Sequence, residues 1–223
     1  MARDISSRRN VARKAGGEEY EKKRKAILDA AATVFKEKGY HAVNSTDIAK
    51  RAGMRRASIY YYYSGKKEIF RDMVGSAEED NVLMAERIAA GPEHPAQKIT
   101  SLIEGLFSSY ARHYPYLFVY VQEDMTRLMN DKSAWSKNMR SLERRFDAAL
   151  IQIIQAGIDD GSFQATANPR WLMMAIIGMC NWSHRWFDPA RMQDGKEIAA
   201  AFSDLVLDGL VTRKIRAVRP RRP

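Results

Sequence analysis

The spacing of apolar residues is the feature that most restricts the fold of this chain. From residue 18 to 38, and again beyond residue 70, apolar residues recur three and four positions apart, as on one face of a helix. Beyond residue 70, alternating strand-like runs never exceed a few residues. The clearest helical repeat consists of Leu142, Phe146, Ala149, Leu150, Ile153, Ile154 and Ile158. The pattern predicts an all-α protein.

Glycine, proline and capping residues divide this pattern into helices. Gly39 and Gly161 each follow a periodic stretch and can end a helix, whereas Asn168 and Pro169 together favour a helix start. We expect helices at about 18–38, 45–52, 55–62, 64–90, 95–113, 115–129, 133–160, 169–187 and 192–212. These lengths suit a small helical module followed by a larger helical body.

The stretch NSTDIAKRAGMRRASIYYYY has the spacing of a helix-turn-helix. Asn44 or Ser45 can cap a short first helix. Ala49 is small enough for two helices to cross closely, Gly53 supplies the positive φ of a tight turn, and Ile59 can hold the second helix against the first. Small and apolar residues match such a pattern by chance as well, so the motif needs support from its surroundings.

Four consecutive tyrosines, in the segment GMRRASIYYYYSGK at 53–66, cannot all be buried by one helix, because neighbours point about 100° apart. If Ile59 faces inward, Tyr62 and Tyr63 return to its side. The residues that then lie outward or on the flanks are Arg55, Arg56, Ser58, Tyr60 and Tyr61. Arginines and tyrosines presented in this way suit a DNA groove, since guanidinium groups bond guanine and phenols bond phosphate. A protein interface is the alternative.

Positive charge is concentrated at the two ends of the chain. Residues 1–67 hold 17 Lys/Arg against 7 Asp/Glu, residues 68–212 hold 14 against 20, and residues 213–223 hold six basic residues and no acid. This segregation indicates a polyanion-binding module joined to a body with another task. For the tails alone, an aid to solubility is an equally good interpretation.

Residues 24–70 resemble the DNA-binding domain of the tetracycline-repressor (TetR) family of transcription regulators. The matching features are the opening helix ILDAAATVFKEKGY, then STDIAKRAG, then SIYYYY and a lysine shortly afterward. Tyr62 and Tyr63 stand where the family more often has histidine and phenylalanine, and Arg55-Arg56 replaces a commoner pair of a small residue and lysine. These differences keep the fold and leave the operator sequence open.

The resemblance implies an all-α homodimer in which a three-helix N-terminal domain binds a palindromic DNA operator and a C-terminal helical bundle binds a small effector. Residues matched to family positions that contact the DNA backbone are Ser45, Thr46, Tyr60, Tyr61 and Lys66, and those nearest base edges are Arg55, Arg56 and Ser58. The expected organisation is a basic arm at 1–17, a helix-turn-helix domain at 18–68, a ligand-binding and dimerisation domain at 69–214 and a basic tail at 215–223.

Aromatic residues and methionines of the body could line an effector pocket, although ordinary core packing is the alternative for each of them. They are Phe107, Tyr110, Tyr114, Phe118, Val121, Met125, Phe146, Met173 and Met174. In NWSHRWFDP, Trp182 and Trp186 flank Arg185, which could hold a ligand phosphate or carboxylate. This stretch resembles a signature of acyl-coenzyme-A-responsive TetR members, which implies an acyl-CoA or a hydrophobic acid as effector.

Catalytic and metal-binding constellations are missing from the sequence. The four histidines are scattered, and there is no H-x-x-x-H spacing, phosphate-binding glycine loop or G-x-S-x-G. The single cysteine, Cys180, lies in an apolar stretch and excludes an intramolecular disulfide. We therefore expect no enzyme activity, no metal and no cofactor, and a cytoplasmic protein at the nucleoid. No apolar run approaches 18 residues, so no membrane partner is expected.

The sequence favours a ligand-responsive regulator, most simply a repressor that the effector releases from DNA. Two alternatives stay open. A nonspecific architectural DNA-binding protein would use the basic ends but would not need the aromatic body. A helical lipid carrier or enzyme would carry the basic ends incidentally. Binding to random competitor DNA separates the three.

Overall fold

The computed structural model describes residues 17–114, 119–120, 132–164, 168–189 and 195–210. The helices in this part of the chain are α2 (Glu18–Lys38), α3 (Ser45–Arg51), α4 (Arg56–Tyr62), α5 (Lys66–Ala90), α6 (Pro95–Arg112), α9 (Ala134–Asp159), α10 (Pro169–Trp182), the 3₁₀ turn η1 (Ser183–Arg185) and α11 (Gly195–Leu210). The all-α prediction is confirmed. The helix expected at 115–129, the basic arm up to residue 16 and the basic tail lie outside the described residues, apart from residues 119 and 120.

Most helix boundaries follow the residues that predicted them. Gly39 has a φ of 77° directly after α2, and Asn168 caps α10 with its side chain. α10 is shorter than expected, because it gives way at Trp182 to the 3₁₀ turn. There the hydroxyl of Ser183 donates to the carbonyl oxygen of Cys180 at 2.6 Å.

The chain divides into two compact units. One contains the described parts of 1–79 and 113–139, and the other contains those of 80–112 and 140–223. The division falls inside α5, so this helix begins in the first unit and ends in the second. The domain boundary expected after residue 68 stays a prediction.

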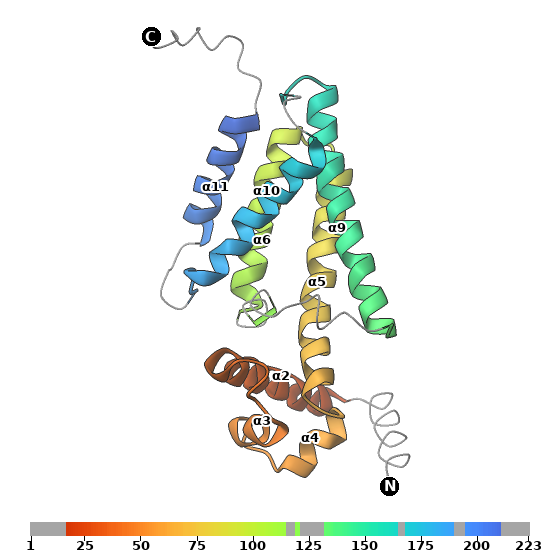
Figure 1. Cartoon of the computed structure of the whole chain (residues 1–223), viewed down its shortest axis with the longest axis vertical. Helices are drawn as coiled ribbons and strands as arrows, with labels where there is room; N and C mark the ends of the chain where they lie inside the picture. Colours follow the sequence, from red (N-terminus) through yellow and green to blue (C-terminus); the bar gives the residue numbers. More distant parts are fainter. Residues whose placement is uncertain (1–16, 115–118, 121–131, 165–167, 190–194, 211–223) are drawn as a thin grey trace. The chain divides into compact units, whose positions relative to one another are not determined.

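The helices α2, α3 and α4 lie together with the first turns of α5 (Figure 1), and they share an apolar core. Its fully buried side chains include Ile27, Phe35, Ile48, Ile59 and Phe70. Burial of such a side chain contributes about 1.5–3 kcal/mol. The start of α9 belongs to the same unit, where the indole N–H of Trp135 donates to the carbonyl oxygen of Arg71 at 3.1 Å.

The second unit is built around α6, which packs along α11. The ring of Phe107 on α6 lies 5.8 Å from that of Phe187 and 5.3 Å from that of Phe202, both nearly perpendicular to it. At the end of α9, a Cβ atom on Gly157 would come within 2.3 Å of the Phe163 ring. The glycine is therefore required for this ring to pack on the helix.

Candidate nucleic-acid interface and effector region

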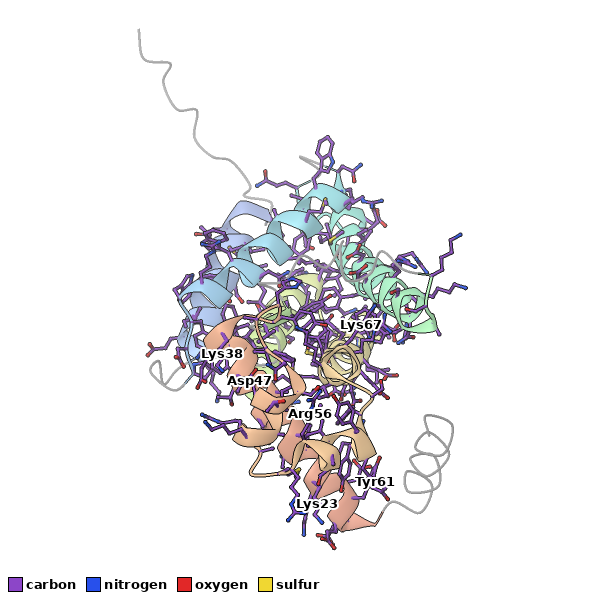
Figure 2. The ribbon with its side chains drawn as sticks, turned by 60° about the horizontal axis from the view of Figure 1, so that its bottom comes forward. Lys23, Lys38, Asp47, Arg56, Tyr61 and Lys67 are labelled. Atoms are coloured by element: carbon purple, nitrogen blue, oxygen red, sulfur yellow. The ribbon has the colours of Figure 1, made fainter. Side chains whose placement is uncertain are left out.

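The first helix of the helix-turn-helix is fixed at its start by a capping box. The side chain of Asn44 accepts hydrogen bonds from the backbone N–H groups of Thr46 and Asp47, at 2.8 and 3.1 Å, and Asp47 accepts one from the N–H of Asn44. Lys38 at the end of α2 donates to Asp47 at 2.8 Å, so the two side chains lie together in Figure 2. The bonds from Lys38 and from Asn44 lower the pKa of the Asp47 carboxyl. Asn44, rather than Ser45, is the cap.

The turn and the second helix follow the predicted spacing. Ala49 is buried in α3, Gly53 has a φ of 66°, and Ile59 is fully buried beneath α4. The N–H of Met54 donates to the carbonyl oxygen of Ala49 at 2.9 Å and closes the turn. α4 therefore presents one fixed face to the outside.

That outward face of α4 is basic and aromatic. Arg55, Arg56 and Ser58 are exposed, and Tyr61 is 43% exposed. Arg56 and Tyr61 are labelled in Figure 2. Tyr60 is half-buried on the flank. A face of this composition can approach phosphate oxygens and base edges without rearrangement.

A hydrogen-bonded group holds the side chain of Arg56 against α4. Nε and Nη2 of Arg56 donate to the hydroxyl oxygen of Tyr60 at 3.3 and 3.0 Å, and the guanidinium carbon lies 5.6 Å from the Tyr60 ring centre. Hydrogen bonds with Arg56 and with Ser45 of α3 lower the pKa of the Tyr60 hydroxyl. The guanidinium is thus partly positioned before any partner arrives.

The end of α4 is anchored to α2 through aromatic rings. Tyr20 on α2 contacts Tyr62 with a ring separation of 4.9 Å and Tyr61 with one of 6.4 Å. Tyr62 is only half-buried by this contact, whereas Tyr63 is fully packed. The tyrosine run is consequently shared between packing and presentation, with Tyr61 the most exposed of the four.

Tyr63 also takes part in a polar network with α2 and α5. Its hydroxyl donates to Asp72 at 2.6 Å, and Arg24 donates to both carboxylate oxygens of Asp72, with a shortest distance of 2.6 Å. Burial, followed by the hydrogen bond to Asp72, raises the pKa of Tyr63 well above its usual value. The end of α4 is therefore held by the hydrogen bond from the neutral Tyr63 hydroxyl to Asp72, whose carboxylate is paired with Arg24.

Lys66 is bound by groups of its own unit. Its ammonium donates to the carbonyl oxygens of Tyr40, His41 and Val43 at 2.9, 2.9 and 2.8 Å. An ammonium has three N–H bonds, so these contacts occupy all of them. The side chain is thus held within its own unit, and a contact of Lys66 with DNA phosphate stays a prediction.

Several predicted effector residues of the second unit lie in its interior. Phe107, Tyr110 and Met173 are buried, and Phe146 is half-buried. The Tyr110 ring lies 5.7 Å from that of Phe187, which the sequence analysis missed together with Phe202. Phe202 lies in the apolar helix α11, where its spacing could have found it, whereas Phe187 follows the 3₁₀ turn outside any helix. Phe118, Val121 and Met125 lie outside the described residues.

Other members of the predicted set are placed differently. Met174 and Trp182 are 60% and 58% exposed, and Trp186 is 42% exposed, so they do not line the interior of this chain. Met174 and Trp182 lie on the outward side of α10, whose buried positions are Met173, Ile176 and Cys180, and Trp186 follows the 3₁₀ turn. The guanidinium of Arg185 stacks on the Trp182 ring at 4.6 Å. Tyr114 belongs to the first unit, where the ammonium of Lys36 lies 4.3 Å from its ring centre.

A groove of about 230 Å³ separates the exposed sides of α10 and α11. Its lining is apolar and consists of Leu172, Ala175, Ile176, Met179, Leu205, Val206, Gly209 and Leu210. Trp171 on α10 and Leu205 on α11 are each 67% exposed in the single chain. Two neighbouring helices therefore present a continuous apolar face.

The described residues contain no cluster of three or more metal-ligating side chains, and none of their helices has the length and apolarity to cross a membrane. Burial raises the pKa of the Cys180 thiol to about 12. The thiol is therefore protonated and unreactive at neutral pH.

Comparison with known proteins agrees with this architecture. Residues 27–73 match the model of bacterial regulatory proteins of the tetR family, and residues 92–210 match the tetracyclin repressor-like C-terminal domain. The HTH-type transcriptional repressor KstR2 of Rhodococcus jostii (strain RHA1) is 22% identical over 85% of this chain and 92% of that protein. The uncharacterized HTH-type transcriptional regulator YfiR of Bacillus subtilis (strain 168) is 30% identical over 66% of this chain and 71% of that protein.

A solved structure shares the fold as well. The ketosteroid transcriptional regulator KstR2 of Mycobacterium tuberculosis has a TM-score of 0.78 at 20% identity, covering 85% of this chain and 95% of that one. These relatives are regulators, which confirms the expectation that the chain is not an enzyme. With the C-terminal model alone spanning more than half of its residues, the chain belongs to the TetR family of transcriptional regulators.

Proposed function

We propose that this chain is a repressor that binds a palindromic operator as a homodimer, in the cytoplasm, and leaves it when a small effector binds. The observation that carries the proposal is the fixed outward face of α4, with Arg55, Arg56, Ser58 and Tyr61. Arginine can bond guanine in a bidentate way, while the hydroxyls of Ser58 and Tyr61 can reach phosphate or base edges. Ser45 and Thr46, the first two residues of α3, would contact backbone phosphates.

The apolar face of α10 and α11 supports the homodimer. Exposed tryptophan, methionine and leucine side chains around a groove are costly to leave in water, at about 25 cal/mol per Å² of apolar surface. A second copy of the same face would cover them, and a twofold interface repeats each contact. In the family the last two helices form such a four-helix bundle. Two helix-turn-helix units would then reach half-sites about 34–36 Å apart.

The interior of the second unit supports an apolar effector. Phe107, Tyr110 and Phe187 form an aromatic cluster, and their rings favour a flat or aliphatic ligand. One relative of this fold is described as a ketosteroid regulator. The Arg185 and Trp182 pair adds a cation on an aromatic surface that can bind an anionic group. A hydrophobic acid or its coenzyme A thioester combines both properties.

A mobility-shift experiment tests the DNA part of the proposal. The probe is the DNA upstream of the chain's own gene, and random duplex DNA serves as competitor. A repressor should keep its own region bound at competitor excesses that remove a nonspecific protein, because specific sites are commonly 10³–10⁷-fold tighter. Equal competition by random DNA would favour an architectural protein, and no binding to either would favour a carrier.

A thermal-shift screen tests the effector part separately. The ligands are coenzyme A thioesters, free fatty acids and steroid acids, each at saturating concentration. A ligand present at 100 times its Kd should stabilise the chain by about 2.7 kcal/mol, and should also release the bound upstream DNA. Unchanged melting with every member of the panel would remove this effector class and leave the DNA assignment standing.

A further inference from the structure

Lys66 occupies an internal cation site in the first unit. The carbonyl oxygens of Tyr40, His41 and Val43 converge on its ammonium at 2.8–2.9 Å, and the ammonium lies 4.8 Å from the centre of the Tyr40 ring. Tyr40 and Val43 are buried, so two of these carbonyls belong to residues that water hardly reaches. A buried carbonyl without a hydrogen-bond donor costs about 1–3 kcal/mol.

The three carbonyls belong to the connection between α2 and α3. Gly39, with its φ of 77°, turns the chain sharply after α2, and the following residues are not helical until Asn44 caps α3. Their carbonyl oxygens cannot enter a helical ladder, and Lys66, the first residue of α5, supplies the donors instead. The side chain thereby ties the start of α5 to the loop directly before α3.

The positive end of the α5 helix dipole is also balanced by a carboxylate of the same helix. Glu68 accepts hydrogen bonds from both the backbone N–H and the hydroxyl of Ser64, each at 2.6 Å. A carboxylate at a helix N-terminus provides the negative charge that a phosphate would otherwise bring. Lys66 and the helix end are therefore both engaged by groups of the chain itself.

We propose that Lys66 is a positioning residue of the DNA-binding face and not a phosphate contact. By holding the loop at 40–43, it fixes Asn44 and with it the direction in which α3 presents Ser45 and Thr46. This inference rests on the proposed DNA-binding function. It predicts that the loss of Lys66 disturbs how α3 is presented to the DNA and lowers sequence preference. The number of DNA phosphates that the protein neutralises should stay the same.

Chemical labelling of the unaltered chain tests the site without any substitution. Lysines are acetylated briefly with an amine-reactive reagent, with and without upstream DNA, and the modification of Lys66 and Lys67 is compared by mass spectrometry. Lys67 is the matched control, since it is the adjacent and exposed residue (Figure 2). We expect Lys66 to react at least ten-fold more slowly than Lys67 in the free chain, with no further change on adding DNA. Equal reaction in the free chain, followed by protection of Lys66 on DNA, would overturn the proposal.

Salt dependence provides the second test. A phosphate contact contributes about 0.9 to the slope of log affinity against log salt concentration. We expect Lys66→Ala to leave this slope unchanged while reducing the preference for upstream over random DNA at least five-fold. Lys66→Arg should not restore the preference, because a planar guanidinium cannot donate to three converging carbonyls as an ammonium does. A slope lowered by about 0.9 in Lys66→Ala, or rescue by arginine, contradicts the positioning role.

These outcomes separate the inference from the proposed function. If the unaltered chain binds no DNA, the repressor assignment fails, while slow labelling of Lys66 in the free chain would still report the carbonyl site. If the chain binds its upstream region and Lys66 labels rapidly, the repressor assignment stands and the positioning role fails.

Discussion

The two units of this protein both expose aromatic side chains, but they hold them in different ways. On α4, the Tyr60 hydroxyl accepts hydrogen bonds from Arg56, and Tyr61 packs edge to face against Tyr20. On α10, the ring of Trp171 is exposed, and the neighbouring groove between α10 and α11 is lined by apolar residues that include Leu205. The first surface combines charge, hydroxyl groups and fixed geometry, whereas the second offers apolar area.

This difference teaches what each surface can recognise. A preformed polar face suits a polyanion, because its groups form directional bonds and lose little freedom on binding. An apolar face gains by leaving water and needs a partner of similar character, for which a second copy is the simplest choice. Substitutions on the polar face of α4 should therefore change DNA affinity, and a charge placed on the apolar face of α10 and α11 should change dimer affinity.

The largest effect is expected from Leu205→Glu, which places a charge in the apolar groove. In a twofold dimer the change occurs twice, and the lost burial alone amounts to about 4 kcal/mol, or roughly a 1000-fold weaker dimer. Sedimentation velocity over a concentration series measures this shift. The matched control is Leu83→Glu, at an exposed leucine of α5 that does not line the groove. Equal dissociation of both variants, or of neither, would contradict the assignment of the groove.

The next effect contrasts the inward and outward sides of α4. Ile59→Ala removes the fully buried anchor of the helix and should destabilise the first unit by about 2–5 kcal/mol. Tyr61→Ala, on the exposed side, should cost less than about 1 kcal/mol of stability and should instead weaken DNA binding. Urea denaturation followed by circular dichroism gives the first quantity, and mobility shift gives the second. A stability loss in Tyr61→Ala as large as that in Ile59→Ala would show that the face is not free for DNA.

A smaller effect is expected from the paired side chains on that face. Arg56→Ala should weaken binding of the upstream region by about 1–3 kcal/mol and relax its preference over random DNA. Tyr60→Phe removes the hydroxyl that bonds Arg56 and Ser45, and should weaken DNA binding by about 1 kcal/mol. Tyr62→Phe is the control for the loss of one hydroxyl on the same helix, because Tyr62 packs against Tyr20 and is not among the proposed DNA contacts. Unchanged affinity in Arg56→Ala would remove this residue from the reading surface.

The helix-turn-helix was predictable because its signals are local. Ala49, Gly53 and Ile59 lie within eleven positions of one another, and each was recognisable from the size or backbone freedom of its own residue type. Helix ends were predictable for the same reason, as at Gly39 and Asn168. Local periodicity suffices for such features, since they need no distant partner.

The partners of Lys66 were not predictable from spacing. The lysine lies 23–26 residues from the carbonyls that it binds. The position of a lysine in the sequence does not show whether its ammonium binds carbonyls of its own chain or a phosphate. For α10, which is apolar nearly all round, spacing alone cannot say which side faces the interior of the chain. Of the two neighbouring methionines predicted to contact an effector, Met173 is buried and Met174 is 60% exposed.

The smallest effect concerns the ion pair at the start of α3 and depends on pH. Because Lys38 and the N–H of Asn44 lower the folded-state pKa of Asp47, this carboxylate stabilises the fold at pH values above its unfolded pKa of about 3.9. The stabilisation is then lost as pH falls through the lower folded value. Asp47→Asn keeps an acceptor for the N–H of Asn44 and removes only the charge. Its melting temperature should therefore lie slightly below that of the unaltered chain at pH 7, and the two should converge once the pH falls below the lowered folded-state pKa of Asp47.

Salt distinguishes this ion pair from the rest of the capping box. The Lys38 side chain is half exposed, so its attraction to Asp47 should be screened above about 0.5 M salt, whereas the hydrogen bonds of Asn44 should persist. The difference in melting temperature should accordingly shrink with added salt at pH 7. A difference that stays constant with both salt and pH would mean that the asparagine disturbs the cap itself and that the charge of Asp47 contributes nothing.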